Sequence, residues 1–222
     1  MTRVISAVRE TGSIKHHASS LISLLESCLA HSLRPSGRGD PPHAKMASDI
    51  MSCVFLNYDK KPVMQLAIPV AVKFLHKGNK DLSRNMSSYM SLAAIENADL
   101  LATHLQPILD SVISGNYSLS RVLPAIFAVD RELIKNHVMT LVSILPNCAD
   151  SENLALLTLF GLIAKDTPAL LEPSIPQLCE CLSQQSTAPP TLQVCYNFFS
   201  VKSEKKVLSE KKSLLAIVKV IS

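Results

Sequence analysis

Four short stretches decide the fold: Ala67–Val70 (AIPV), Leu105–Ile108 (LQPI), His137–Thr140 (HVMT) and Ile175–Leu178 (IPQL). They recur at intervals of roughly 33 to 38 residues, between the periods of tetratricopeptide repeats and of HEAT or armadillo repeats, although the third copy lacks the proline. Each stretch belongs to an apolar segment of helical length, and short polar breaks separate the segments. Repeats of this kind stack as helix pairs, and such stacks usually bind other molecules rather than catalyse reactions.

Second helices are expected between these stretches, in segments rich in small and branched apolar residues: Tyr89–Ile95, Val122–Phe127 and Leu156–Ile163. Pro107, Pro124 and Pro176 should lie in first turns, because the amide that proline lacks has no intrahelical partner there. The pattern predicts an all-α fold, an α-solenoid of stacked helical hairpins of the armadillo or HEAT type. An ordinary helical bundle is the alternative.

The composition favours helices as well. Of the 222 residues 47% are hydrophobic and 5% aromatic, and six glycines are few for a sheet-rich fold with many tight turns. Helix starts are predicted from capping residues. Ser13 should precede a helix that ends near Leu33, Asp81 or Ser83 should cap the helix that follows the glycine stop at His76–Asn79, and Asp99 should precede a later helix.

The chain is expected to comprise four parts. They are amino-terminal helices in residues 1–34, an exposed linker in 35–42, armadillo/HEAT-like repeats in 43–187, and a segment of uncertain nature in 188–222. The last part reads either as terminal helices that form a divergent final repeat or as an unrelated basic tail.

The charge pattern predicts no nucleic-acid partner, because a net charge of +4 is far below the concentrated basic stripe that phosphate contacts need. Basic residues gather locally in the tail, which contains Lys202, Lys205, Lys206, Lys211 and Lys212 with Glu204 and Glu210. We interpret this as a solvated helix face, with a basic amphipathic membrane-binding segment as the alternative. No window is apolar and long enough to cross a bilayer and no signal peptide precedes Arg9, so we expect an intracellular chain.

No pattern indicates an enzyme or a metal site. The six cysteines lack CxxC spacing, and Cys179 and Cys181 would point to different sides of a helix. The seven histidines form no HExxH motif, and Gly37-Arg38-Gly39 lacks the strand, helix and lysine of a phosphate-binding loop. We therefore expect buried free thiols, no catalytic residue, no cofactor or metal, and no small-molecule substrate.

Three long, non-repetitive segments carry a family resemblance: Pro42–Cys53 (PHAKMASDIMSC), Ala67–Lys80 (AIPVAVKFLHKGNK) and Arg84–Ile95 (RNMSSYMSLAAI). Together they resemble the amino-terminal region of the Melted family, the ventricular-zone-expressed PH-domain proteins. The resemblance is dense over about residues 5–130, looser to about 182, and absent after Thr187.

The resemblance implies a non-enzymatic intracellular signalling adaptor with an armadillo-like amino-terminal region, whose carboxy-terminal PH domain binds phosphoinositides at the plasma membrane. It also implies links to insulin and TOR growth signalling, forkhead factor control and TGF-β receptor signalling. This chain has no β-rich segment that could supply a PH domain, so it resembles a fragment, a short isoform or an incomplete gene model. Lipid binding by such a domain is not expected of its residues, and a fragment without a function of its own is a further alternative.

The leading functional prediction is protein binding through a helical-repeat surface, with signalling proteins as partners. The residues proposed for this contact are polar or aromatic and are expected to be exposed: Tyr58, Lys73, Arg84, Asn85, Tyr89 and Arg121. Each of these residue types is also common as an ordinary surface or capping residue.

Overall fold

The structure, a computed structural model, describes residues 2–36, 39–76 and 79–203. Within these ranges every regular element is a helix, and a single isolated β-bridge joins Ser36 to Gly39, which confirms the all-α prediction. The chain divides into two compact units, residues 1–134 and 135–222, which we describe separately. The predicted boundaries at 34, 42 and 187 remain a prediction, and the basic tail beyond residue 203 lies outside the described residues.

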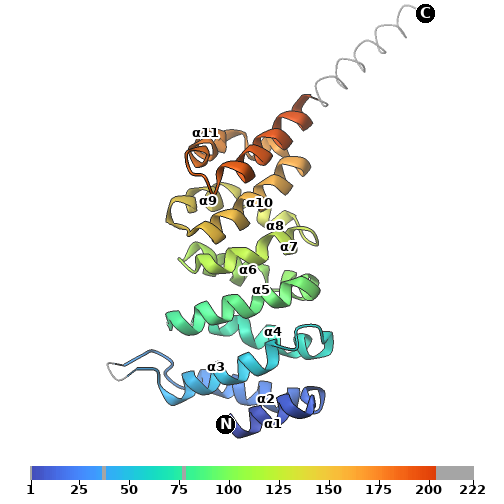
Figure 1. The fold of residues 1–222 in the computed structure, drawn as a ribbon, viewed down its shortest axis with the longest axis vertical. Coiled ribbons are helices and arrows are strands. Elements are labelled where there is room, and N and C mark those ends of the chain that lie inside the picture. Colours follow the sequence, from blue (N-terminus) through green and yellow to red (C-terminus); the bar gives the residue numbers. More distant parts are fainter. Residues whose placement is uncertain (1, 37–38, 77–78, 204–222) are drawn as a thin grey trace, which may run out of the picture. The chain divides into compact units, whose positions relative to one another are not determined.

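The first unit consists of helices that follow one another closely along the chain (Figure 1). They are α1 (Thr2–Thr11), α2 (Ile14–Ser27), η1 (Cys28–Ala30), α3 (Pro42–Phe55), α4 (Lys61–Phe74), α5 (Lys80–Ala102), α6 (Leu105–Ile113), η2 (Tyr117–Val122), α7 (Leu123–Phe127) and α8 (Glu132–Lys135), the last of which crosses the boundary between the units.

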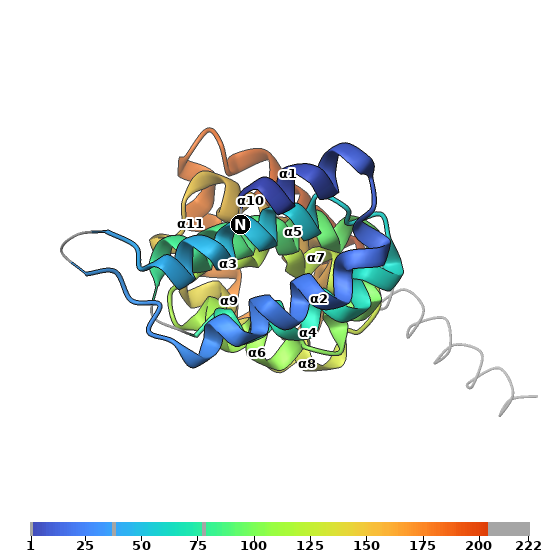
Figure 2. The ribbon, with the colours of Figure 1, turned by 90° about the horizontal axis from the view of Figure 1, so that it is seen from below.

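These helices form two layers. Neighbours in sequence pack as pairs, α2 with α3, α4 with α5, and α6 with η2, while α2 also packs on α4 and α5 packs on both α3 and α7. Viewed from below, α2, α4 and α6 lie on one side of the unit, and α1, α3 and α5 lie on the other (Figure 2). Alternate helices therefore belong to the same layer.

The core of this unit lies between the layers. Its largest fully buried side chains include Ile50, Phe55, Met64, Ile68 and Phe74, which come from α3 and α4. Burying one such side chain stabilises the fold by about 1.5–3 kcal/mol, so the spacing of the apolar residues determines which face of each helix turns inward.

The prolines confirm one prediction and show that the repeats are irregular. Pro107, Pro124 and Pro176 lie in the first turns of α6, α7 and α11 (Ile175–Glu180), as expected. Pro69, by contrast, lies inside α4, where its ring removes an intrahelical amide hydrogen bond. The recurring stretches therefore occupy different positions along their helices.

The structure corrects the cap of one predicted helix and agrees with the position of two other predicted starts. Asn79, rather than Asp81 or Ser83, caps α5, because its side chain accepts a hydrogen bond from the Leu82 amide at 2.9 Å. Ser13 is the N-cap residue of α2, although its hydroxyl contacts Thr11 at 2.7 Å and makes no capping bond. Asp99 lies two residues after a break at Asn97, where two helical stretches meet within α5.

The second unit contains short helices around one long one. They are α9 (Val138–Ser143), η3 (Leu145–Asn147), α10 (Asp150–Asp166), η4 (Pro168–Leu170), η5 (Glu172–Ser174), α11 and η6 (Cys181–Ser183), and residues 188–203 are also helical. Its core includes Phe160, Leu178 and Val194. At the start of α10, Ala149 is the N-cap, and its amide donates to the Glu152 carboxylate at 2.8 Å.

Candidate functional site

The six residues proposed from the sequence all lie in the first unit, but the structure does not bring them together at one site. Arg84 and Asn85 are exposed neighbours near the start of α5, and the Arg84 guanidinium lies 4.0 Å from Asp81. Tyr89, on the same helix, is half-buried, and its ring stacks on Phe55 with 5.9 Å between ring centroids. Of the six proposed residues, only these three lie on the same helix.

The other three proposed residues lie on elements other than α5. Lys73 is on α4, in the opposite layer, and its ammonium group lies 2.6 Å from Glu26 of α2. Tyr58 is half-buried in the turn after α3, and Arg121 of η2 donates to the Ser118 carbonyl at 3.1 Å. A role of any of the six in binding stays a prediction.

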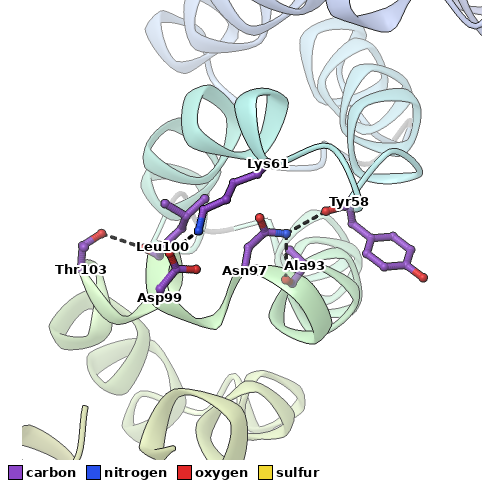
Figure 3. A network of polar contacts seen from close by, with 7 residues as sticks. All are labelled: Tyr58, Lys61, Ala93, Asn97, Asp99, Leu100 and Thr103. Carbon is purple, nitrogen blue, oxygen red and sulfur yellow. Dashed lines mark hydrogen bonds and ion pairs between the residues drawn. The ribbon is translucent and has the colours of Figure 1, made fainter. Parts of the chain in front are cut away.

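The break in α5 at Asn97 is the main local feature of the first unit, and it lies two residues before Asp99, which the sequence proposes as a helix start. Asn97 has φ −132° and ψ 37°, outside the helical range, and is 1% exposed. Its side-chain amide donates to the Tyr58 carbonyl at 2.7 Å and to the Ala93 carbonyl at 3.3 Å (Figure 3). The Asn97 side-chain amide therefore connects the turn after α3 to the break in α5.

Polar contacts surround this break. The ammonium group of Lys61 lies 2.6 Å from the Asp99 carboxylate, and the Thr103 hydroxyl donates to the Leu100 carbonyl at 2.7 Å (Figure 3). The hydrogen bond from Lys61 holds the pKa of Asp99 below its usual range. Among the described residues, the Asn97 Oδ1 atom is buried without a hydrogen-bond partner. These contacts fix the position of the Leu56–Lys60 turn against α5.

Similar side-chain amide contacts recur one helix pair apart in the first unit. Asn79 donates to the Leu33 carbonyl at 2.8 Å, and Asn116 donates to the Ser83 hydroxyl and accepts from the Ser87 hydroxyl, each at 3.0 Å. Together with Asn97, these asparagines connect residues that are 29 to 46 positions apart. Buried amides with several partners hold neighbouring helices in one arrangement. These hydrogen bonds therefore fix the positions of neighbouring helices in the first unit relative to one another.

In the second unit, side-chain amides and an ion pair also connect segments that are distant in sequence. Asn197 donates to the Gly161 carbonyl at 3.1 Å, and Gln177 donates to the Val142 carbonyl at 3.3 Å. Lys135 and Asp166 form an ion pair at 2.9 Å, and their side chains are only 18% and 22% exposed. Amide and charged side chains thus fix the helices of this unit as well.

Five of the six thiols are poorly suited to nucleophilic chemistry at neutral pH, while Cys179 is exposed, contrary to the expectation of buried thiols. Burial raises the pKa of Cys28, Cys53, Cys181 and Cys195, and burial together with the nearby Glu152 raises the pKa of Cys148 to about 11. A thiol with a raised pKa is mostly protonated, whereas the thiolate is the reactive form. Burial also lowers the pKa of His104, which favours its neutral form.

The described part of the chain contains no group of three or more His, Cys, Asp or Glu side chains that could hold a metal ion. In the same residues, no helix is both long and apolar enough to cross a membrane.

Sequence reasoning also missed three exposed apolar side chains: Leu56 just after α3, Ile95 just before the break in α5, and Val129 just after α7. Their exposure depends on how the helices pack, and apolar residues at those positions look like core residues in the sequence. Two sequence signals point to the break in α5, namely Asn97, a poor helix former in a long helical pattern, and the capping candidate Asp99.

Known proteins resemble this chain over most of its length. It is 46% identical to Protein melted of Drosophila melanogaster over 196 residues, which cover 87% of this chain and 20% of that protein. It is 52% identical to the human ventricular zone-expressed PH domain-containing protein homolog 1 over 166 residues, covering 74% of this chain and 20% of that protein, and 51% identical to the mouse protein with the same coverage.

The chain thus spans about one fifth of the length of these curated relatives. No protein-family model matches it, and no solved structure matches it either. At 46 to 52% identity over most of its residues, the chain belongs to the Melted family, the family of the ventricular zone-expressed PH domain-containing proteins.

Proposed function

We propose that this chain is a non-enzymatic signalling scaffold, an α-solenoid of the armadillo or HEAT type that binds protein partners through its stacked helices. The observation that carries the proposal is the two-layered first unit, in which α2 packs on α4 and α3 packs on α5, with asparagine side chains between successive helix pairs. Stacked helix pairs present extended surfaces, and binding is the usual function of such surfaces.

The family relationship supports the signalling part of this proposal. Two of the relatives are named PH domain-containing proteins. Phosphoinositide binding at the plasma membrane would belong to that domain, and partners in insulin and TOR, forkhead factor or TGF-β signalling would be recruited by the helical region. This chain would then supply the protein-binding part of the adaptor.

The exposed start of α5 is the first surface to test. Arg84 and Asn85 are exposed, so changing them to Glu and Lys should leave the fold intact. Lys15 is the matched control, because it is also exposed and charged but lies on α2 in the other layer and is not among the residues proposed for binding. Tyr89 is left unchanged, because its stacking on Phe55 would confuse a binding effect with a folding effect.

The experiment is affinity capture from a cell lysate with the full chain, followed by mass spectrometry and by calorimetry with each recovered protein after purification. We expect saturable binding that the Arg84→Glu, Asn85→Lys variant weakens at least tenfold and that Lys15→Glu leaves unchanged. Recovery of chaperones alone, or the absence of saturable binding by every purified candidate, would contradict the scaffold function. Equal binding by all variants would show that the start of α5 does not contact the partner.

A further inference from the structure

Residues 188–203 form the last described helix of the second unit, and one side of this helix exposes large apolar side chains. Leu192, Tyr196 and Phe199 are 59%, 67% and 58% exposed. Successive residues of a helix are about 100° apart around its axis, so these three side chains lie within about 60° of one another. They form one continuous stripe along the helix, which we call the terminal stripe.

The opposite side of the same helix packs on the core of the second unit. Val194 is fully buried, and Asn197 and Phe198 are 5% and 3% exposed. The Asn197 side-chain amide donates to the Gly161 carbonyl of α10 at 3.1 Å. The terminal stripe therefore faces away from α10.

The terminal stripe carries no charge. The only Lys, Arg, Asp or Glu in residues 188–203 is Lys202. Its ammonium group lies 2.6 Å from Glu172 and 5.0 Å from the centroid of the buried Phe198 ring, beside the packed side of the helix. Contiguous apolar surface without charge usually marks a contact with another segment or molecule.

The chain itself supplies a segment that fits the terminal stripe. It continues for 19 residues beyond residue 203, and this part of the sequence has apolar residues at near-helical spacing. They are Val207, Leu208, Leu214, Leu215, Ile217, Val218 and Ile221. Residues 204–206 are all charged, and two antiparallel helices are commonly joined by about two to five residues. The segment 207–221 is therefore long enough, and close enough in sequence, to fold back along the helix.

A hairpin of this kind brings apolar residues of the two segments to the same level. When the connection is centred on Lys205, residues equally far from it in sequence are level, because both helices rise about 1.5 Å per residue. Tyr196 is then level with Leu214, and Leu192 is level with Val218. Both pairs join an exposed side chain of the stripe to an apolar residue of the segment.

The charged residues of the segment are compatible with the same register. Phe199 is level with Lys211, whose aliphatic stem can cover the ring while its ammonium group reaches solvent. Glu210 is level with Ser200, which is polar, and Lys212 falls on the outer side of the second helix. No charge is forced into the contact.

A covering segment in the same chain has an advantage over a second molecule. A short connection holds it near the stripe at an effective concentration in the millimolar range. An isolated helix of about 15 residues is only marginally stable in water, so packing on the stripe would also stabilise the segment. One contact then buries both apolar surfaces.

From the exposed stripe, its lack of charge and the adjoining apolar segment, we propose that residues 207–221 fold back as a helix that covers Leu192, Tyr196 and Phe199. The terminal stripe is thus an interaction surface for the carboxy-terminal segment of the same chain. This contact goes beyond the proposed scaffold function, because it requires no partner protein.

Hydrogen exchange of the full chain, measured by mass spectrometry, tests whether the segment is docked. We expect the amides of residues 207–221 to exchange at least tenfold more slowly than in an unstructured peptide. The variant Leu192→Ser, Tyr196→Ser should remove this protection. The control variant Val4→Ser, Leu66→Ser changes exposed apolar residues of the first unit and should leave it unchanged. Circular dichroism checks that both variants fold.

Disulfide cross-linking tests the register. In the variant Leu192→Cys, Val218→Cys, oxidised glutathione should join positions 192 and 218, and peptide mass spectrometry identifies the product. The control variant Leu192→Cys, Leu208→Cys is ten residues out of register, a displacement of about 15 Å, and should yield at least tenfold less cross-link. Both variants retain the same native cysteines.

Rapid exchange of residues 207–221, protection that persists in the Leu192→Ser, Tyr196→Ser variant, or equal cross-linking of the two pairs would overturn the proposal. A concentration-dependent dimer of the full chain in sedimentation, abolished by the same variant, would also overturn it, because a second copy would then cover the stripe. None of these measurements depends on affinity capture of a partner. The scaffold function can therefore stand where this inference fails.

Discussion

Asn79 offers the sharpest test of how the first unit is held together. Its side chain is 2% exposed and makes three hydrogen bonds. It accepts from the Leu82 amide at 2.9 Å, and it donates to the Leu33 carbonyl at 2.8 Å and to the Asp40 carboxylate at 3.0 Å. One residue thus caps α5 and ties it to the segment between η1 and α3.

Replacing Asn79 with Ala should destabilise the protein by about 2–4 kcal/mol. Loss of the cap costs about 1 kcal/mol, and leaving the buried Leu33 carbonyl without its donor costs about 1–3 kcal/mol more. Urea unfolding followed by far-UV circular dichroism measures the loss, and hydrogen exchange at the first turn of α5 locates it. Asn85→Ala is the control, because Asn85 is exposed on the same helix, and it should change stability by less than about 0.5 kcal/mol.

The Asn79→Asp variant separates the two contributions. A carboxylate can still accept from the Leu82 amide, but it faces the Leu33 carbonyl and the Asp40 carboxylate with no proton to donate. Repulsion would raise the pKa of the introduced carboxyl in the folded state, so the variant should be most stable relative to wild type at low pH and lose stability as pH rises through that pKa. Equal unfolding midpoints for Asn79→Ala and Asn85→Ala, or an Asn79→Asp variant with no such pH dependence, would refute this reasoning.

Three other predictions follow from the contacts. Asn97→Ala should cost about 1–2 kcal/mol in urea unfolding, because the loss of the Tyr58 contact is partly offset by removing the unpartnered Oδ1; a variant as stable as wild type would show that the contact contributes nothing to stability. Lys135→Ala should cost about 1–2 kcal/mol even at high salt, since the pair with Asp166 is mostly shielded, whereas Lys73→Ala should cost less than about 0.5 kcal/mol; similar costs for both would contradict this contrast. Because the pKa of Cys148 is raised to about 11, its thiol should react slowly with iodoacetamide at pH 7, and its contribution to stability should be full below about pH 9 and decline toward pH 11; alkylation at pH 7 as fast as that of the exposed Cys179, measured by mass spectrometry, would contradict the raised pKa of this half-buried thiol.

The sequence predicted features that depend on local chemistry. Apolar spacing located most of the long helices, and the missing amide of proline placed Pro107, Pro124 and Pro176 in first turns. Sequence reasoning was wrong where several neighbouring residues could each cap the same helix. Asn79, Asp81 and Ser83 can all cap a helix, and the choice of Asn79 depends on its contacts with Leu33 and Asp40, which are distant in sequence.

The candidate binding surface was harder to predict for the same reason. Arg84 and Asn85 are exposed as expected, but Tyr89 packs on Phe55 and Lys73 pairs with Glu26. Ile95 belongs to an apolar segment predicted as a second helix, yet it is exposed, because an apolar residue gives the same sequence pattern whether it faces inward or outward. Exposure is a property of the packed helices and not of the local sequence.

The hydrogen bonds between helices join residues that are close together in the sequence, and this affects how the chain folds during translation. In the first unit, the contacts from Lys73 to Glu26, from Asn79 to Leu33, from Asn97 to Tyr58 and from Asn116 to Ser87 join residues 29 to 47 positions apart. At about 5–20 residues translated per second, both partners of such a contact are made within roughly 1–10 s of each other. Each helix pair can therefore dock on the preceding pair while the ribosome is still extending the chain, which limits how long the apolar faces between the layers stay open to aggregation.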